Sequence, residues 1–381
     1  MFSGCNLSPL LFSIFISNLG HELNSTDLGL DLGGICVSAI FFADDICLLG
    51  SSPQALNSLM TITRRYFTGH QLELSEKKSK IMTYNAGPGE VRFSTPGEVP
   101  IILEQVLAFK YLGIPLNSSP YSLFKDFNNQ VKRKAQSYLA SVLSLVKTGP
   151  DRTDLAHSLW TCCALPAILY GAEIMPLTQS TINEIEKCQS QVGKFILQVP
   201  RSTSNVVSYI DAGLKPIWAV ISERVLMYAH HLMKKPSNYW PRIALNMNMV
   251  PGKLSPYMRY LQRWKAAVNT SLLSAKLIKK SVNRAAIVDV LDQQRKCSVT
   301  TFAASPPDIL KPAWFKPKPW VSDSYSTKVL AMFRSCNASL GNRGPTKDGR
   351  FFKLCPLCEE QGVTALNNEV RILFHDTFFN N

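Results

Sequence analysis

Two adjacent carboxylates, Asp44 and Asp45, are the residues of this sequence whose types and spacing most directly suggest chemistry. They stand between two apolar runs, ICVSAIF before Phe42-Ala43 and ICLLG after the pair. Apolar runs of strand length on both sides predict a β-hairpin over residues 35–50 with the acids at its tip. Carboxylates about 4 Å apart repel by roughly 1 to 4 kcal/mol, and a divalent cation such as Mg²⁺ relieves that repulsion. The alternative is an ordinary Asp-Asp turn in a buried hairpin.

Four further segments stand in a fixed order around this pair. SGCNLSPLLF (3–12) lies upstream, and LSEKKSKIM (74–82), FKYLGI (109–114) and LPAILYGAE (165–173) lie downstream. In this order and at these intervals the chain closely resembles the reverse transcriptase of non-LTR (LINE-type) retrotransposons. The upstream segment is similar to motif B, the acidic hairpin to motif C, the lysine-rich segment to motif D and the Tyr-Leu-Gly segment to motif E. The last segment is similar to the one that follows the thumb.

The resemblance implies catalytic roles for four of these residues. Asp44 and Asp45 would be ligands of Mg²⁺, and a lysine of motif D, Lys78 or Lys80, would help to protonate the leaving pyrophosphate. The sequence does not choose between the two lysines. The alternative for this lysine-rich stretch is a polar turn between a helix and a strand.

Nucleic-acid contacts are expected at five positions. The resemblance assigns Gly4 to motif B, and Tyr111 and Gly113 to the primer grip. Lys132 and Arg133 are inferred from helical periodicity, because they point away from the apolar stripe that runs over residues 127–146. Such a helix suits a thumb that holds a template–primer duplex, although a plain amphipathic helix with a solvated face fits these residues equally well.

The start of the chain departs from the family pattern. In the family, motif A supplies a further metal-binding Asp before motif B, and the fingers precede motif A. Here motif B begins at Ser3, after two residues, and Ser3 and Asn6 stand where the family has Gln and Pro. We therefore expect an N-terminally truncated fragment that holds Mg²⁺ loosely and has little or no polymerase activity alone, because two-metal catalysis needs the bridging carboxylate.

Near the end, Cys355, Cys358 and His375 resemble the C-terminal zinc-knuckle-like motif of these elements. A Cys-x-x-Cys pair suits Zn²⁺, and a structural zinc site wants four ligands. The family's fourth ligand, a Cys a few residues after the His, is absent from residues 376–381. A zinc ion held by three protein ligands would be bound weakly.

The charge distribution agrees with a nucleic-acid partner. The chain has 41 Lys and Arg against 27 Asp and Glu, a net charge of +14. Residues 1–63 contain five acids and no Lys or Arg, so the basic excess lies entirely after them. A metal site beside a basic surface that binds phosphate backbone would have this pattern. The expected partners are an RNA template and a DNA primer; a generic basic protein with solvated lysines is the alternative.

Periodicity predicts an α+β fold: a partial polymerase palm followed by a mainly helical thumb and C-terminal region. Helices are expected over residues 10–23, 53–67, 153–171, 178–196 and 216–234, with Ser52 as an N-cap. Strands are expected over residues 79–84, 91–94, 101–103 and 108–114. The predicted domains are a partial palm (1–120), a thumb-like helical region (121–235), a helical and basic connecting region (236–345) and a zinc-knuckle-like C-terminus (346–381).

Composition narrows the class of protein. No apolar run reaches the roughly 20 residues that a bilayer needs, and the apolar stretch near the N-terminus has no preceding Lys or Arg as a signal peptide would. The ten cysteines form no disulfide framework, which favours an intracellular protein of the nucleus or cytoplasm. The oligomeric state stays open. Two functions follow: a reverse transcriptase fragment, or a non-catalytic nucleic-acid-binding protein that uses the basic helices.

Overall fold

The computed structural model describes residues 7–83, 89–93, 100–146, 152–247, 255–269 and 274–295. The chain divides into two compact units. The first, here called the hairpin unit, comprises residues 1–127 and 228–262, and the second, the helical unit, comprises residues 128–227 and 263–381. The four predicted domains stay a prediction.

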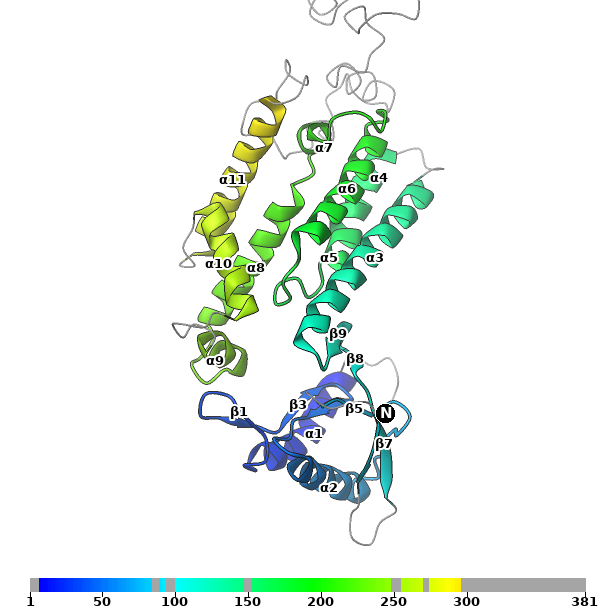
Figure 1. The fold of residues 1–381 in the computed structure, drawn as a ribbon, viewed down its shortest axis with the longest axis vertical. Helices are drawn as coiled ribbons and strands as arrows, with labels where there is room; N and C mark the ends of the chain where they lie inside the picture. The colour runs from blue at the N-terminus through cyan, green and yellow to red at the C-terminus, as the bar shows by residue number, and fades with distance from the viewer. Residues whose placement is uncertain are drawn as a thin grey trace, which may run out of the picture. The chain divides into compact units, whose positions relative to one another are not determined.

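The hairpin unit combines helices with short strands, as the predicted α+β class requires (Figure 1). Its helices are α1 (Ser8–Asn24), α2 (Pro53–Gly69) and α9 (Trp240–Met247). Its strands are β1 (Leu30–Asp31), β2 (Cys36–Val37), β3 (Ala39–Phe42), β4 (Asp45–Leu48), β5 (Lys80–Ile81), β6 (Gly89–Phe93), β7 (Ile101–Gln105), β8 (Ala108–Tyr111) and β9 (Ile114–Asn117). The pairs β1–β2, β3–β4 and β8–β9 are antiparallel, whereas β5–β7–β6 is a three-stranded sheet in which β5 runs parallel to β7.

Helix α2 begins where the sequence predicts. The Ser52 hydroxyl accepts a hydrogen bond from the Ala55 amide at 3.1 Å, and Pro53 occupies the first helical position. Both features favour a helix start, because the cap satisfies one free amide and proline has none to satisfy. Five residues of the helix are buried at helical spacing along it: Ala55, Leu59, Met60, Thr63 and Tyr66. This buried face packs α2 against the strands.

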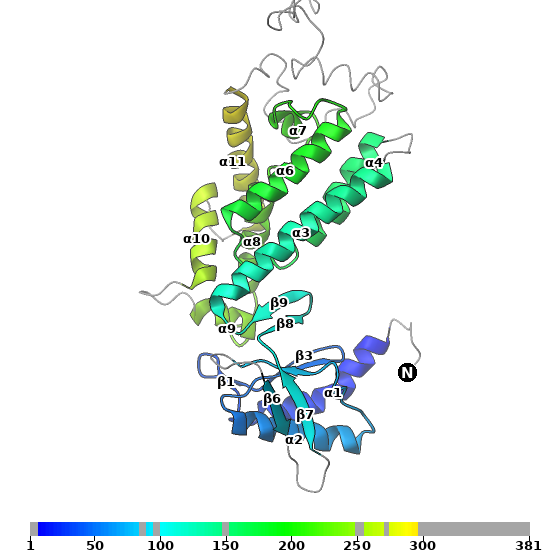
Figure 2. The ribbon, with the colours of Figure 1, turned by 45° about the vertical axis from the view of Figure 1, so that its right-hand side comes forward.

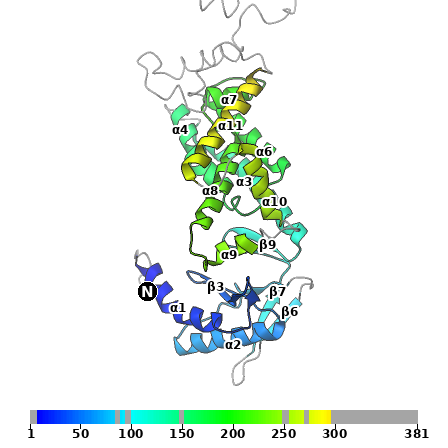
Figure 3. The ribbon, with the colours of Figure 1, turned by 90° about the vertical axis from the view of Figure 1, so that its left-hand side faces the viewer.

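The acidic hairpin rests on a core made by α1 and α2, which run side by side in Figure 3. The buried residues of this core come from both helices and from β3: Ile16, Leu19, Leu23, Ala39, Leu59 and Tyr66. Phe41, Ile46 and Leu48 of the hairpin pack against it. Burial of large side chains of this kind contributes roughly 1.5 to 3 kcal/mol each, so the helices fix one face of the β3–β4 ribbon.

A second cluster ties α2 to the three-stranded sheet (Figure 2). Its buried members are Met60, Ile81, Phe93, Ile101 and Leu103. Strand β7 alternates buried and exposed side chains at Ile101, Ile102, Leu103 and Glu104, as a strand with one covered face does.

The single strand predicted over residues 108–114 is wrong. The chain forms the hairpin β8–β9 instead, with Tyr111 paired to Ile114 across a two-residue turn. Leu112 and Gly113 both have positive φ, 47° and 81°. Two successive left-handed residues match the right-handed twist of the flanking strands, and a Gly at the second of them costs no strain.

The helical unit contains the long basic helix predicted from its apolar stripe. Its elements are α3 (Pro120–Val146, from residue 128), α4 (Arg152–Ser158), a π-helical segment η1 (Leu159–Ala164), α5 (Leu165–Ile168), α6 (Gln179–Ile196), α7 (Val206–Ile210), α8 (Ile217–Met233, to residue 227), α10 (Pro256–Val268, from residue 263) and α11 (Ala275–Arg295). The predicted helices over residues 178–196 and 216–234 are confirmed. Among the described helices, none is long and apolar enough to cross a membrane.

Candidate functional site

The acidic pair lies at the turn of the β3–β4 hairpin. Phe42 pairs with Asp45, which leaves Ala43 and Asp44 as a two-residue loop. Both acids are exposed to solvent. Ala43 has φ 50°, a left-handed conformation that a side chain with a Cβ rarely adopts. Backbone strain of this kind clusters at functional sites, and here it makes the turn tight enough to present two consecutive acids at one end of the ribbon.

Asn24, at the end of α1, fastens the start of this ribbon to the helix. Its Nδ2 donates to the carbonyls of Gly20 (3.1 Å) and Ala39 (3.2 Å). Its Oδ1 accepts from the amides of Ser38 (2.8 Å) and Ala39 (3.1 Å). One amide side chain thus satisfies backbone groups of both the helix and β3, which fixes where the hairpin leaves the core.

The outer face of β3 is apolar and uncovered. Ile40 and Phe42 are 40% and 60% exposed, while their neighbours Ala39 and Phe41 belong to the core with α1 and α2. The alternation follows the two-residue period of a strand. Ile40 and Phe42 thus place an exposed apolar surface beside the two exposed acids.

Tyr111 of β8 lies beside the acidic hairpin. Burial first, and then the charges of Cys47 and Asp45, raise the pKa of the Tyr111 phenol. Its hydroxyl is buried and has no hydrogen-bond partner among the described residues. Burial likewise raises the pKa of the Cys47 thiol on β4. The β8–β9 hairpin therefore places a neutral phenol near Asp45.

The two candidate lysines differ in their surroundings. Lys80 lies in β5 and donates to Glu104 of β7 at 2.7 Å, directly across the parallel pair. Lys78 lies in an exposed turn, where its backbone amide donates to the Ser75 carbonyl. A polar turn does precede β5, as the alternative to a catalytic role describes, and of the two lysines Lys78 is the more exposed residue.

The donor chemistry of the acidic pair suits a hard cation, because Mg²⁺ prefers carboxylate oxygens together with water and phosphate. Two carboxylates fit one loosely held ion. Within the described parts of the chain, no group of three or more His, Cys, Asp or Glu residues could hold a metal. A third protein ligand for Asp44 and Asp45 is therefore not found among the described residues.

Other predicted site residues lie elsewhere. Lys132 and Arg133 belong to the helical unit, where Arg133 is exposed and the Lys132 ammonium donates to the Ser180 hydroxyl at 3.0 Å. The residues Gly4, Cys355, Cys358 and His375 lie outside the described residues, so their roles stay predictions. The five cysteines within the described ranges, Cys36, Cys47, Cys162, Cys163 and Cys188, are free thiols.

Sequence reasoning missed Asn24 and the strained Ala43. An Asn after an apolar helical run indicates a helix end, and nothing in its neighbours reveals bonds to a strand 15 residues later. Ala43 carried a stronger signal. A two-residue hairpin loop requires at least one positive φ, and Ala-Asp offers no glycine to adopt it.

Comparison with known protein families gives a match to the segment that contains the acidic hairpin. No curated protein matches the chain. Residues 1–116 match a family model described as "Reverse transcriptase (RNA-dependent DNA polymerase)". The match contains the acidic hairpin, the lysine-rich turn and the β8 strand with Tyr111, and it ends within β9. The segment that carries the exposed acid pair is therefore similar to the reverse transcriptase domain of RNA-dependent DNA polymerases.

Proposed function

We propose that the chain is part of a reverse transcriptase of the non-LTR retrotransposon type, which binds an RNA template with a DNA primer. One observation carries the proposal. The adjacent acids Asp44 and Asp45 are exposed at the turn of a ribbon whose other end is buried under two helices, inside the segment that matches the reverse transcriptase family.

Residues of the hairpin unit would have different roles at this site. Asp44 and Asp45 would hold Mg²⁺, which when bound neutralises charge on phosphate oxygens. Lys78 is the better candidate for donating a proton to the leaving pyrophosphate, because Lys80 is already paired with Glu104. Exposed ion pairs of that kind contribute about 0 to 1 kcal/mol, so the pairing of Lys80 with Glu104 gives Lys78 only a small advantage.

Asp44 and Asp45 supply too few ligands for two metal ions. Two-metal phosphoryl transfer needs carboxylates that fix both ions, and most of its rate comes from positioning. We therefore propose that residues 1–381 alone have little or no polymerase activity.

Primer extension on an RNA template, with Mg²⁺ and residues 1–381 as the only protein, tests this proposal. The expected result is no extension above background. Robust synthesis that Asp44→Asn abolishes would overturn the incomplete-site proposal while supporting the assignment of Asp44.

Metal binding tests the acid pair separately. Mn²⁺ is a suitable probe, because it binds oxygen ligands as Mg²⁺ does and its free concentration is measured by electron paramagnetic resonance. Asp44→Asn and Asp45→Asn should each weaken Mn²⁺ binding about tenfold or more. Asp27→Asn, which removes another exposed acid of the same unit, is the matched control. Equal affinity in all four proteins would refute a metal-binding role.

A non-catalytic nucleic-acid-binding function is the second candidate. It is favoured by an exposed row of cations on α11: Lys276, Lys279, Lys280 and Arg284. Arg133 and Lys132 of α3 add to the basic surface of the helical unit. Such contacts release counterions, so affinity should fall steeply with salt.

Charge reversal separates the two candidates. Lys132→Glu combined with Arg133→Glu should weaken RNA binding and lower the salt slope by about 1 to 2, since each lost phosphate contact removes roughly 0.7 to 0.9. Asp44→Asn should leave RNA binding unchanged. An affinity that does not depend on salt would contradict both candidates.

A further inference from the structure

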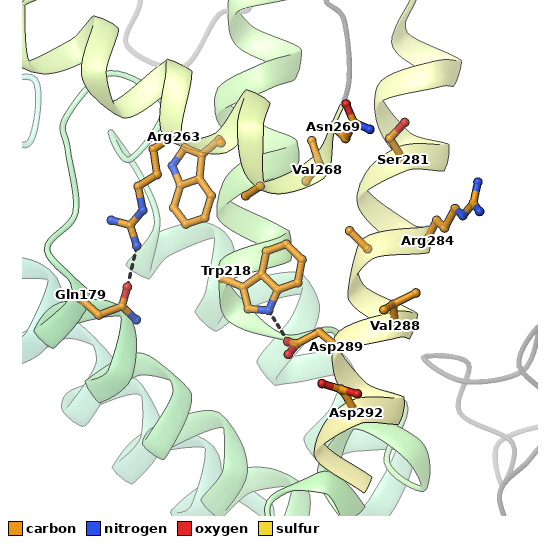
Figure 4. A pocket seen from close by; sticks show the side chains of 13 residues that line it. Gln179, Trp218, Arg263, Val268, Asn269, Ser281, Arg284, Val288, Asp289 and Asp292 are labelled. Carbon is orange, nitrogen blue, oxygen red and sulfur yellow. Dashed lines mark hydrogen bonds between the residues drawn. The ribbon is translucent and has the colours of Figure 1, made fainter. Parts of the chain in front are cut away.

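A pocket of about 820 Å³ lies within the helical unit, between the start of α6, helix α8, the end of α10 and helix α11 (Figure 4). Its volume falls in the range of roughly 300 to 1,000 Å³ that is typical of small-ligand sites. No residue of the acidic hairpin lines it. Its chemistry therefore needs an explanation of its own.

The centre of the pocket is an indole held in a fixed plane. Trp218 is half-buried, and its Nε1 donates to Oδ2 of Asp289 at 2.7 Å. Figure 4 shows its ring lying in the middle of the cavity, with Asp289 of α11 below it. By contrast, Trp264 is buried, and the Arg263 guanidinium covers its ring at 4.7 Å from the centroid. Trp218 thus offers the stacking surface, and Trp264 forms a wall.

Stacking on an indole suits a nucleobase, because every base has a π-face and each such contact is worth roughly 1 to 3 kcal/mol. Apolar side chains complete a slot of the same character: Ala267, Val268, Ala285 and Val288. A flat aromatic ligand is therefore the class that the walls favour.

Two carboxylates select among the bases. Asp289 and Asp292 stand one helical turn apart on α11, and both line the pocket. Figure 4 shows the Asp292 side chain directed from α11 to the same side as that of Asp289. An ionised carboxylate only accepts hydrogen bonds. Guanine offers two adjacent donors, N1–H and the N2 amino group, whereas the corresponding edges of adenine, cytosine and uracil place a donor beside an acceptor. One carboxylate can pair with both guanine donors.

Cations at the rim suit the phosphates that accompany a base. Arg263 and Arg284 are exposed and line the pocket. Arg263 donates to Gln179 across the α6 side of the opening, and Arg284 continues the exposed cationic row of α11. Two guanidinium groups at the rim disfavour a cationic ligand, although the two acids alone would accept one.

We propose that this pocket binds an unpaired guanine, stacked on Trp218 and paired through the carboxylate of Asp292, as a base of a bound nucleic-acid strand. This proposal rests on the proposed function, which supplies the premise that the protein binds a nucleic-acid strand. The pocket supplies base preference, and the basic helices supply backbone affinity.

Fluorescence anisotropy with labelled hexanucleotides tests the base preference. A strand of uridines with one central guanine is compared with strands that carry adenine or inosine at that place, and inosine lacks only the N2 amino group. The guanine strand should bind about tenfold more tightly than the adenine strand, as a good bidentate pair allows, with inosine between them. A deoxyribose version of each strand shows whether the pocket prefers a guanine from RNA or from DNA.

Asp292→Asn is the deciding variant, because Asp292 is exposed and its replacement leaves the core intact. It should abolish the guanine preference and leave binding of the adenine strand unchanged. Ala285→Phe, which fills the slot without changing charge, should do the same. Glu184→Gln, which removes one negative charge from α6 outside the pocket, is the matched control and should keep the preference.

Guanosine monophosphate distinguishes the failure of this proposal from the failure of the proposed function. With 5-fluorotryptophan in the chain, the fluorine signal of Trp218, assigned with Trp218→Phe, should shift on addition of the nucleotide. RNA binding without any guanine preference, or a preference that survives both pocket variants, overturns the pocket proposal alone. A shift at Trp218 without RNA binding upholds the pocket and overturns the proposed function. Absence of both refutes both.

Discussion

The acid pair of the hairpin unit and one acid of the helical unit lie in opposite environments. In the hairpin unit, Asp44 and Asp45 are exposed at a strained turn. In the helical unit, Glu186 is largely buried and accepts hydrogen bonds from the Tyr209 hydroxyl (2.8 Å) and the Ile217 amide (2.8 Å). A carboxylate whose oxygens are used inside the protein stabilises the fold, whereas one that faces solvent is available to a ligand.

The Glu186 network extends through neighbouring side chains. Gln189 donates to Glu186 (3.3 Å) and to the Lys215 carbonyl (2.9 Å), and accepts from Nε1 of Trp160 (3.1 Å). The Ile217 amide lies at the start of α8, where the helix dipole favours a negative charge. Both oxygens of Glu186 thus accept hydrogen bonds from groups of the protein itself.

Removal of the Glu186 side chain should have the largest effect on stability. Glu186→Ala leaves the Tyr209 hydroxyl and the Ile217 amide without their acceptor, and each orphaned buried group costs about 1 to 3 kcal/mol. We expect a loss of about 3 kcal/mol or more in urea unfolding. Glu184→Ala, a half-buried acid of the same helix, should change stability by less than about 1 kcal/mol. Similar losses for both would break the comparison between the two units.

Asn24→Ala should destabilise the hairpin unit by about 2 kcal/mol, because the amides of Ser38 and Ala39 lose their shared acceptor. This result would sharpen the comparison, since it shows that the exposed acids depend on one part-buried polar side chain. Hydrogen exchange of the Ser38 and Ala39 amides reports the loss locally. The control Asn57→Ala, within α2, should be neutral or slightly stabilising. Unchanged protection in Asn24→Ala would show that the helix core alone holds the ribbon.

The pH dependence of stability offers a smaller effect. Burial, partly offset by three hydrogen bonds and reinforced by Asp289, raises the pKa of Glu186 in the folded state. The folded protein therefore keeps this proton to higher pH than the unfolded chain does, so stability falls as pH rises from the ordinary carboxyl pKa of about 4.3 through the raised folded pKa. Urea unfolding across this window should show a negative slope that Glu186→Gln reduces. A slope that Asp44→Asn reduces instead would contradict the assignment.

Relief of strain at the acidic turn should have the smallest effect. Ala43→Gly removes the Cβ from a residue with φ 50°, which relieves strain and stabilises the folded state by about 0.5 to 1 kcal/mol. The extra conformational entropy that glycine gives the unfolded chain offsets most of this gain. We expect a change in unfolding midpoint that is neutral to slightly stabilising. Ala140→Gly, in the exposed face of α3, should instead cost about 1 kcal/mol. Equal losses at the two sites would mean that the turn is unstrained.

Much of the hairpin unit was predictable from local signals. The Ser52 cap, the apolar face of α2 and the apolar runs around Asp44 act within a few residues, so the sequence predicts both elements correctly. The β8–β9 turn was not predicted because Phe109 to Ile114 is apolar enough to read as one strand. Only its positive φ angles, which the fold selects, mark Leu112 and Gly113 as a turn.

The candidate site was only partly predictable. Residue types predicted the acid pair and its place in a turn, because the apolar runs on both sides have the length of strands and leave the two acids between them. Three other features depend on contacts between distant segments: the position of Tyr111 near Asp45, the ion pair of Lys80 with Glu104, and the hydrogen bonds of Asn24 to β3. Periodicity within one element contains no information about such contacts.

The shortness of the loop between Phe42 and Asp45 constrains how this ribbon can change. Its two residues leave no slack, and side chains alternate between the faces of a strand with a period of two. An insertion or deletion of a single residue there would turn Asp45 toward the opposite face or shift every later residue of β4 out of the core. The fold of the ribbon therefore tolerates substitutions at this bend better than changes in its length.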